Sequence, residues 1–180
     1  MCRAALAVAL LLCVAAPQAR AGASCPGAGL RPNAANAAAA AQATLCLINE
    51  IRTAHHLRPL QPNPQLGAVA TSQVRTMVRW DYFADVRPTG QTPMSLIATT
   101  AYRARGAELS VGQNIAWGSG SLSSPSRIVS AWMASPPHRA IILTGEYRDA
   151  GVAVKPALPS VLGAGRRGGT YAMEFAVRRF

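Results

Sequence analysis

The feature that most constrains the fold is a polar residue followed by proline, which occurs at four places along the chain. The four dipeptides are Asn63-Pro64, Thr92-Pro93, Ser124-Pro125 and Ser135-Pro136. In each, the polar side chain can accept a hydrogen bond from a free amide of a first helical turn, and proline lacks only an N–H that would have no helical partner. We therefore expect each dipeptide to begin a helix, with its polar side chain as the cap. In this interpretation Ser135 is a helix cap and not a nucleophile.

Helices and strands are both indicated. Apolar residues recur at helical spacing from Asn36 to His55-His56, where the following prolines end the helix. Short apolar runs at 112–118 and 151–155 are typical of strands, and residues 170–179 alternate between larger apolar side chains and Ala, Glu or Arg. This alternation predicts a strand with one buried and one open face. Residues 156–169, rich in Pro and Gly, predict a mobile loop, and the fold class is α+β.

The amino terminus has the pattern of a secretory signal peptide. Arg3 precedes a short apolar run, and Ala19-Arg20-Ala21 matches a cleavage site, so residues 1–21 are predicted to be removed. Residues 22–35 form an arm without clear pattern, and residues 36–180 form one domain. The apolar run is too short to span a bilayer, and we expect no transmembrane segment. The predicted location is therefore secreted, either extracellular or periplasmic.

Cysteine usage agrees with export. Once the signal is removed, Cys25 and Cys46 are the remaining pair, and an oxidising compartment favours a disulfide between them. The alternative is lipidation of Cys25, which follows small residues but lacks the expected leucine three positions earlier. The sequence favours the disulfide.

The chain is strongly basic. Its formal charge of +11 falls to about +9 without Arg3 and Arg20, and Lys155 is the only lysine. In an exported protein this charge favours an anionic cell-envelope polymer or lipid head groups as partner over nucleic acid. The alternative is a codon bias toward Arg and Ala with no functional meaning.

Two segments carry a family resemblance. Gly112-Gln113-Asn114-Ile115-Ala116-Trp117 is followed by Trp132-Met133-Ala134-Ser135-Pro136-Pro137-His138-Arg139, with further matches at Tyr82-Phe83 and Tyr147 to Val152. In order and spacing they resemble the CAP superfamily of cysteine-rich secretory, antigen 5 and pathogenesis-related-one proteins, in its small bacterial secreted form. The resemblance implies an α-β-α sandwich with a small central antiparallel sheet, formed by residues 36–180.

The same resemblance implies where a ligand cleft would lie. Family members have a His/Glu/Glu/His cluster, and the matching positions here hold Asp85, Gln113, Asp149 and His138. Asn114 and Trp117 adjoin the second of these positions. Only His138 retains the family residue, so the implied metal and hydrolytic chemistry is altered.

The predicted function is a secreted, non-enzymatic CAP-domain protein. It would bind a small-molecule or lipid ligand, or a cell-envelope component, through the cleft around His138, without a cofactor. One alternative is a divalent-metal hydrolase using His138, Asp85 and Asp149, although Gln113 cannot act as a general base. The other is a wall-associated structural module. For His138 itself, a purely structural role stays open.

Overall fold

The computed structural model describes residues 25–180, so the predicted signal peptide lies outside the described residues. The elements, in chain order, are α1 (Ala37–Ala54), β1 (Gln61–Pro62), α2 (Pro64–Arg79), α3 (Pro93–Ala98), β2 (Glu108–Ser119), the 3₁₀ turn η1 (Gly120–Ser123), α4 (Pro125–Ala134), α5 (Pro136–Ile142), β3 (Asp149–Lys155), the 3₁₀ turn η2 (Ser160–Leu162) and β4 (Gly168–Arg179). The α+β class and the three predicted strands are confirmed, as β2, β3 and β4. None of the helices in residues 25–180 is long and apolar enough to cross a membrane.

The sheet has four strands in the order β1-β3-β4-β2. β4 pairs antiparallel with both β2 and β3, as expected for a small antiparallel sheet. β1 differs from this expectation, because its two residues pair parallel with the start of β3, Gln61 with Asp149 and Pro62 with Ala150. The sheet is therefore mixed, and β2 forms one of its edges.

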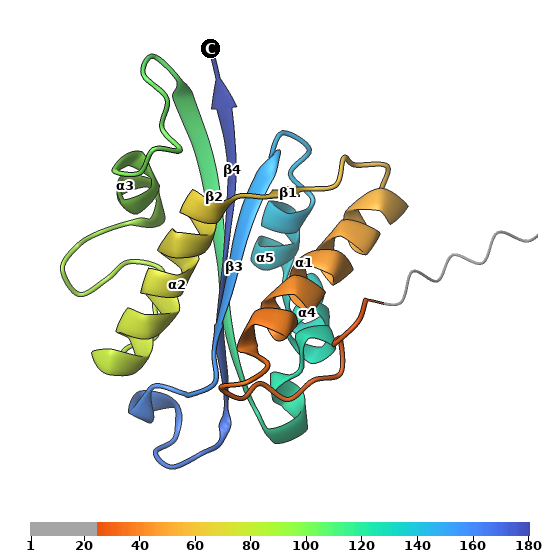
Figure 1. The fold of residues 1–180 in the computed structure, drawn as a ribbon, viewed down its shortest axis with the longest axis vertical. Coiled ribbons are helices and arrows are strands. Elements are labelled where there is room, and N and C mark those ends of the chain that lie inside the picture. Colours follow the sequence, from red (N-terminus) through yellow and green to blue (C-terminus); the bar gives the residue numbers. More distant parts are fainter. Residues whose placement is uncertain (1–24) are drawn as a thin grey trace, which may run out of the picture.

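Helices cover both faces of the sheet, which gives the three-layer sandwich in Figure 1. α1, α4 and α5 pack with Tyr171, Met173 and Phe175 of β4, whereas α2 and α3 pack on the opposite face, where Ala172 and Ala176 lie. The expectation of an open face on β4 is therefore wrong: residues 169–177 are all buried. β4 is a central strand with a helical layer on each side, and its small alanines leave room for α2.

All four Pro-started helices begin where the dipeptides predict, but only two caps form. The side chain of Asn63 accepts hydrogen bonds from the amides of Gln65 and Leu66, and Thr92 forms a capping box with Ser95. Ser124 and Ser135 occupy N-cap positions without a side-chain cap, so that part of the prediction is wrong. The fixed φ of proline, and not the hydroxyl, is the shared signal at these two helix starts.

Arg52 joins the end of α1 to the region after α5. It is fully buried. Its guanidinium donates to four backbone carbonyls, at 3.0 Å to Arg58, 2.6 Å to Ile142, 3.0 Å to Thr144 and 3.3 Å to Tyr147. Burial lowers the pKa of Arg52, and repulsion from Arg148 adds to that effect. A buried cation is tolerated here because all three guanidinium nitrogens donate to backbone carbonyls, through four of their five N–H groups.

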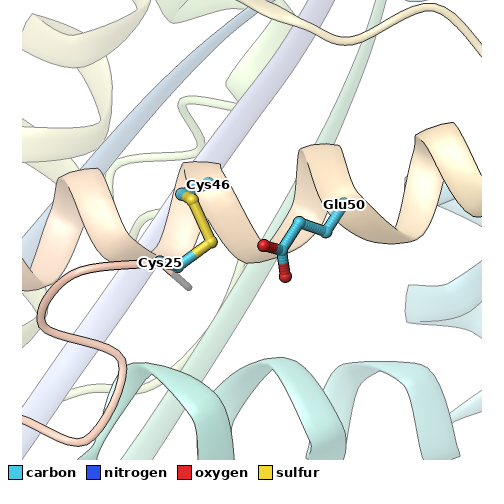
Figure 2. A group of neighbouring side chains, drawn as sticks. All are labelled: Cys25, Cys46 and Glu50. Carbon is cyan, nitrogen blue, oxygen red and sulfur yellow. A yellow bond between two sulfur atoms is a disulfide. The ribbon is translucent and has the colours of Figure 1, made fainter. Parts of the chain in front are cut away.

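The predicted disulfide between Cys25 and Cys46 is present, with a Cα–Cα distance of 5.6 Å. It ties the amino-terminal arm to the middle of α1 (Figure 2). A loop of this size contributes roughly 3 kcal/mol to stability in the chain-entropy model.

Candidate functional site

The segment that follows α2 carries Asp85 and is held against that helix by Gln73. The buried Gln73 amide donates to the carbonyls of Ala84 and Asp85, at 2.9 and 3.3 Å. Its oxygen accepts a hydrogen bond from Nε of Arg87 at 3.0 Å, and Arg87 also donates to Oγ of Ser72 at 2.9 Å. A buried amide on α2 thus fixes the backbone on both sides of the Asp85 side chain.

His138 lies in the first turn of α5 and is held by two contacts. Its Nδ1 is 2.8 Å from Oγ of Ser135, and its carbonyl accepts a hydrogen bond from Nδ2 of Asn114 at 3.1 Å. Ser135 therefore orients the histidine instead of capping the helix. With Nδ1 occupied and the ring half-buried, Nε2 is the nitrogen that is available to a ligand.

Beneath these groups, Gln113 of β2 and Glu174 of β4 form a buried pair. The two residues are direct partners across the strands, and Nε2 of Gln113 donates to Oε1 of Glu174 at 2.6 Å. Burial raises the pKa of Glu174 to about 8, with Asp85 adding to the rise and Gln113 and Arg87 opposing it. Glu174 is therefore mostly protonated at neutral pH.

Protonation also explains two otherwise unpaired atoms. Oε1 of Gln113 and Oε2 of Glu174 are buried without a hydrogen-bond partner. A neutral Glu174 carries one hydroxyl donor, and the amide oxygen of Gln113 is the acceptor in the same pair. In its neutral form the pair therefore offers both a hydroxyl donor and an unpaired amide oxygen, which the ionised form does not.

Asp85 and His138 lie near the outer edge of β2 and are close enough for their charges to interact. Loss of water raises the pKa of Asp85, although the residue keeps an exposed surface, and attraction to His138 acts in the opposite direction. Asp85, Arg87, Gln113, Glu174 and His138 therefore form one polar group, which we call the His138 cluster. Its accessible members are Asp85 and His138.

Asp149 lies apart from that cluster. It begins β3, and its carboxylate accepts a hydrogen bond from the hydroxyl of Tyr102 at 2.7 Å. Burial of Tyr102, and secondly this contact, raise the pKa of the phenol, and the guanidinium of Arg178 lies over the Tyr102 ring at 4.7 Å from its centre. Asp149 therefore anchors the segment after α3 to the sheet.

A metal site is not assembled from the residues that the sequence suggests. Within residues 25–180, the one group of three candidate ligands whose atoms approach one another closely is Cys25, Cys46 and Glu50. Figure 2 shows that both sulfurs there belong to the disulfide, so they are not thiolate ligands. His138, Asp85 and Asp149 do not form such a group, and Gln113 already donates to Glu174.

Trp117, predicted as a cleft residue, lies on the same face of β2 as Gln113 and is 37% exposed. Sequence reasoning missed Glu174, Gln73 and Arg87. The pattern of β4 held a signal for Glu174, which shares one face of the strand with Ala172 and Ala176. A lone carboxylate on a buried face needs a hydrogen-bond partner. That signal becomes readable only once β4 is known to be central.

The sequence matches the model of the cysteine-rich secretory protein family, named CAP, over residues 45–158. This match covers more than half of the chain, so the protein belongs to the CAP family. No curated protein matches the chain in sequence.

Solved structures share the fold. An extracellular protein containing an SCP domain from Bacillus anthracis aligns with a TM-score of 0.58 at 24% identity, covering 74% of this chain and 39% of that one. An outer surface protein from Borrelia burgdorferi aligns with a TM-score of 0.64 at 17% identity, covering 84% and 99%. A cysteine-rich secretory protein from Staphylococcus aureus gives 0.56 at 18% identity, covering 80% and 40%. This chain thus spans about two fifths of the B. anthracis and S. aureus chains, and these identities support the fold alone.

Proposed function

We propose that this CAP-domain protein is exported and binds a cell-envelope ligand, without converting it, at the His138 cluster. The observation that carries the proposal is the arrangement of the cluster in two levels. The Gln113–Glu174 pair is closed and buried, whereas Asp85 and His138 lie above it with a free carboxylate and a free ring nitrogen. Asp85 and His138 can together hydrogen-bond a polar ligand whose hydroxyl or amide groups lie a few ångströms apart.

The same arrangement favours binding over hydrolysis. Glu174 is buried and protonated, so it cannot serve as the general base of a hydrolytic reaction. The oxygen donors of the cluster are also not gathered with His138 around one point where a cation could sit. The non-enzymatic interpretation therefore needs fewer rearrangements than the metal-dependent one.

Localisation and charge support an envelope partner. The sequence begins with the pattern of a signal peptide, a disulfide is present, and the solved structures named above include extracellular and outer-surface proteins. Without the signal the chain carries a formal charge of about +9, which favours anionic polymers or lipid head groups.

The test is equilibrium binding of residues 22–180 to three separate materials: peptidoglycan sacculi, a purified anionic wall polymer and phospholipid vesicles with anionic head groups. We expect saturable binding to one of them, weakened at least about tenfold by Asp85→Asn combined with His138→Gln. His55→Gln, at the exposed end of α1, is the matched control and should bind normally. Binding that is lost in high salt but indifferent to the double substitution would support the wall-associated module instead.

A further inference from the structure

A second candidate site lies on the opposite edge of the sheet from the His138 cluster, in the groove between α1 and α2. Figure 1 looks onto this edge, with β3 between the two helices. A hollow of about 580 Å³ lies over the later residues of β3, and one of about 340 Å³ continues it toward the start of α2. Ala41, Gln42 and Val152 line both, so the two hollows form one groove.

The edge of β3 in this groove has no strand partner after its first residues. The amide of Gln61 donates to the carbonyl of Arg148 and that of Asn63 to the carbonyl of Ala150, each at 2.8 Å. The chain then turns into α2, and no other described strand pairs with this edge. Because backbone groups alternate in direction along a strand, the N–H and C=O groups of Val152 and Val154 point into the groove.

Small side chains keep the groove open. The wall formed by α1 and the residues before it includes Ala34, Ala37, Ala38 and Ala41 beside the larger Gln42 and Leu45, and the neighbouring wall includes Gly67 at the start of α2. Alanine also favours the helix, which is the alternative reason for the run. Small side chains therefore predominate along α1, and Val152, Ala153 and Val154 of β3 line the same groove.

One end of the groove is cationic. Arg75 and Lys155, the only lysine of the chain, line the larger hollow, and both also line an adjoining hollow of about 610 Å³ together with Arg79. No Asp or Glu lines the three hollows, and none of these cations has a salt bridge within residues 25–180. The occupant should therefore carry a negative charge at this end.

We propose that the groove binds an extended peptide of about four to six residues as an added strand on β3, with a carboxylate next to Arg75 and Lys155. The free edge from Gly151 to Lys155 has the length for this, roughly 16 Å at the usual rise of a strand. An acyl chain fits the apolar walls, but it would cover the backbone groups of Val152 and Val154 without pairing them. A peptide backbone pairs them, which decides between the two. The proposal stands independently of the His138 cluster.

The test uses equilibrium dialysis of residues 22–180 against a hexapeptide pool with random side chains and a C-terminal glutamate, read by mass spectrometry. We expect a subset to be enriched. Enriched peptides should lose binding when alternate backbone amides are N-methylated, since this removes strand pairing while the side chains stay. Amidation of the C-terminal carboxyl groups, or Arg75→Gln with Lys155→Gln, should weaken binding by about fivefold or more.

Matched variants locate the site. Ala38→Leu fills the groove on an exposed helical position and should abolish binding, whereas Ala140→Leu on α5 and Arg127→Gln on α4 should leave it unchanged. No enrichment, or enriched peptides that bind equally well after N-methylation, would overturn the proposal. So would binding of palmitate that Ala38→Leu removes while no peptide binds, because the groove would then be an acyl site.

Discussion

Replacing Glu174 with Gln should stabilise the protein at neutral pH, although the substitution is in the core. Burial raises the pKa of Glu174 from 4.5 to about 8. Between these values the folded protein binds one more proton than the unfolded chain, so stability is greatest below pH 4.5 and falls as the pH rises toward 8. At pH 7 the free energy of unfolding is therefore roughly 3 kcal/mol lower than it is below pH 4.5, because each pH unit in this range changes it by about 1.4 kcal/mol.

Glutamine removes this cost and keeps the geometry. Its amide nitrogen replaces the hydroxyl donor of the neutral carboxylic acid, while its oxygen still accepts from Nε2 of Gln113. The difference in unfolding free energy between Glu174→Gln and wild type should therefore be near zero at about pH 4 and grow to roughly 3 kcal/mol in favour of the variant at pH 7.

Urea unfolding at half-unit steps from pH 4 to pH 8, followed by tryptophan fluorescence, measures this difference. Glu108→Gln, at the exposed start of β2, is the control, and its difference from wild type should not vary with pH in the same way. A pH-independent difference for Glu174→Gln would refute the reasoning, because it would mean that the carboxyl group titrates alike in the folded and unfolded chains.

Three further predictions follow from other parts of the structure. The mature protein should have a mass about 2 Da below that of the reduced chain, and Cys46→Ser should lower stability by roughly 3 kcal/mol in denaturant melts; two free thiols or a lipid adduct on Cys25 would contradict the disulfide. Arg52→Met should cost about 3 to 5 kcal/mol, because four backbone carbonyls, two of them in buried hydrogen bonds, lose their donor, while exposed Arg58→Met should cost little. Zinc titration near neutral pH should show no saturable binding, since His138 is the sole imidazole of the cluster; micromolar affinity that disappears in His138→Ala would favour the metal-dependent alternative.

Local signals in the sequence predicted the helix starts, the long strands and the disulfide. The caps at Asn63 and Thr92 are hydrogen bonds to residues two or three positions further along the chain, so the local sequence is enough to specify them. Contacts between distant segments were not predictable in this way. Arg52 binds carbonyls about ninety positions away, which no local pattern encodes.

The site was predicted in part for the same reason. Asp85, Gln113, Asn114 and His138 are found around the outer edge of β2, but Asp149 is engaged by Tyr102. Glu174 was assigned to an open face because alternation in β4 does not reveal whether one or two helical layers cover a strand. Ser135 was assigned to a cap, and its contact with His138, three residues along, competes with that role.

The most direct test of the proposed function is the affinity of residues 22–180 for the proposed envelope materials, measured for wild type, Asp85→Asn, His138→Gln and the double variant at physiological salt. If both residues hold one ligand, each single change should weaken binding and the double change should cost less than the sum of the two, because the partners act together. Arg127→Gln should bind like wild type. Unchanged affinity in the double variant, with binding that falls only as arginines are removed or salt is added, would contradict a ligand site at the His138 cluster.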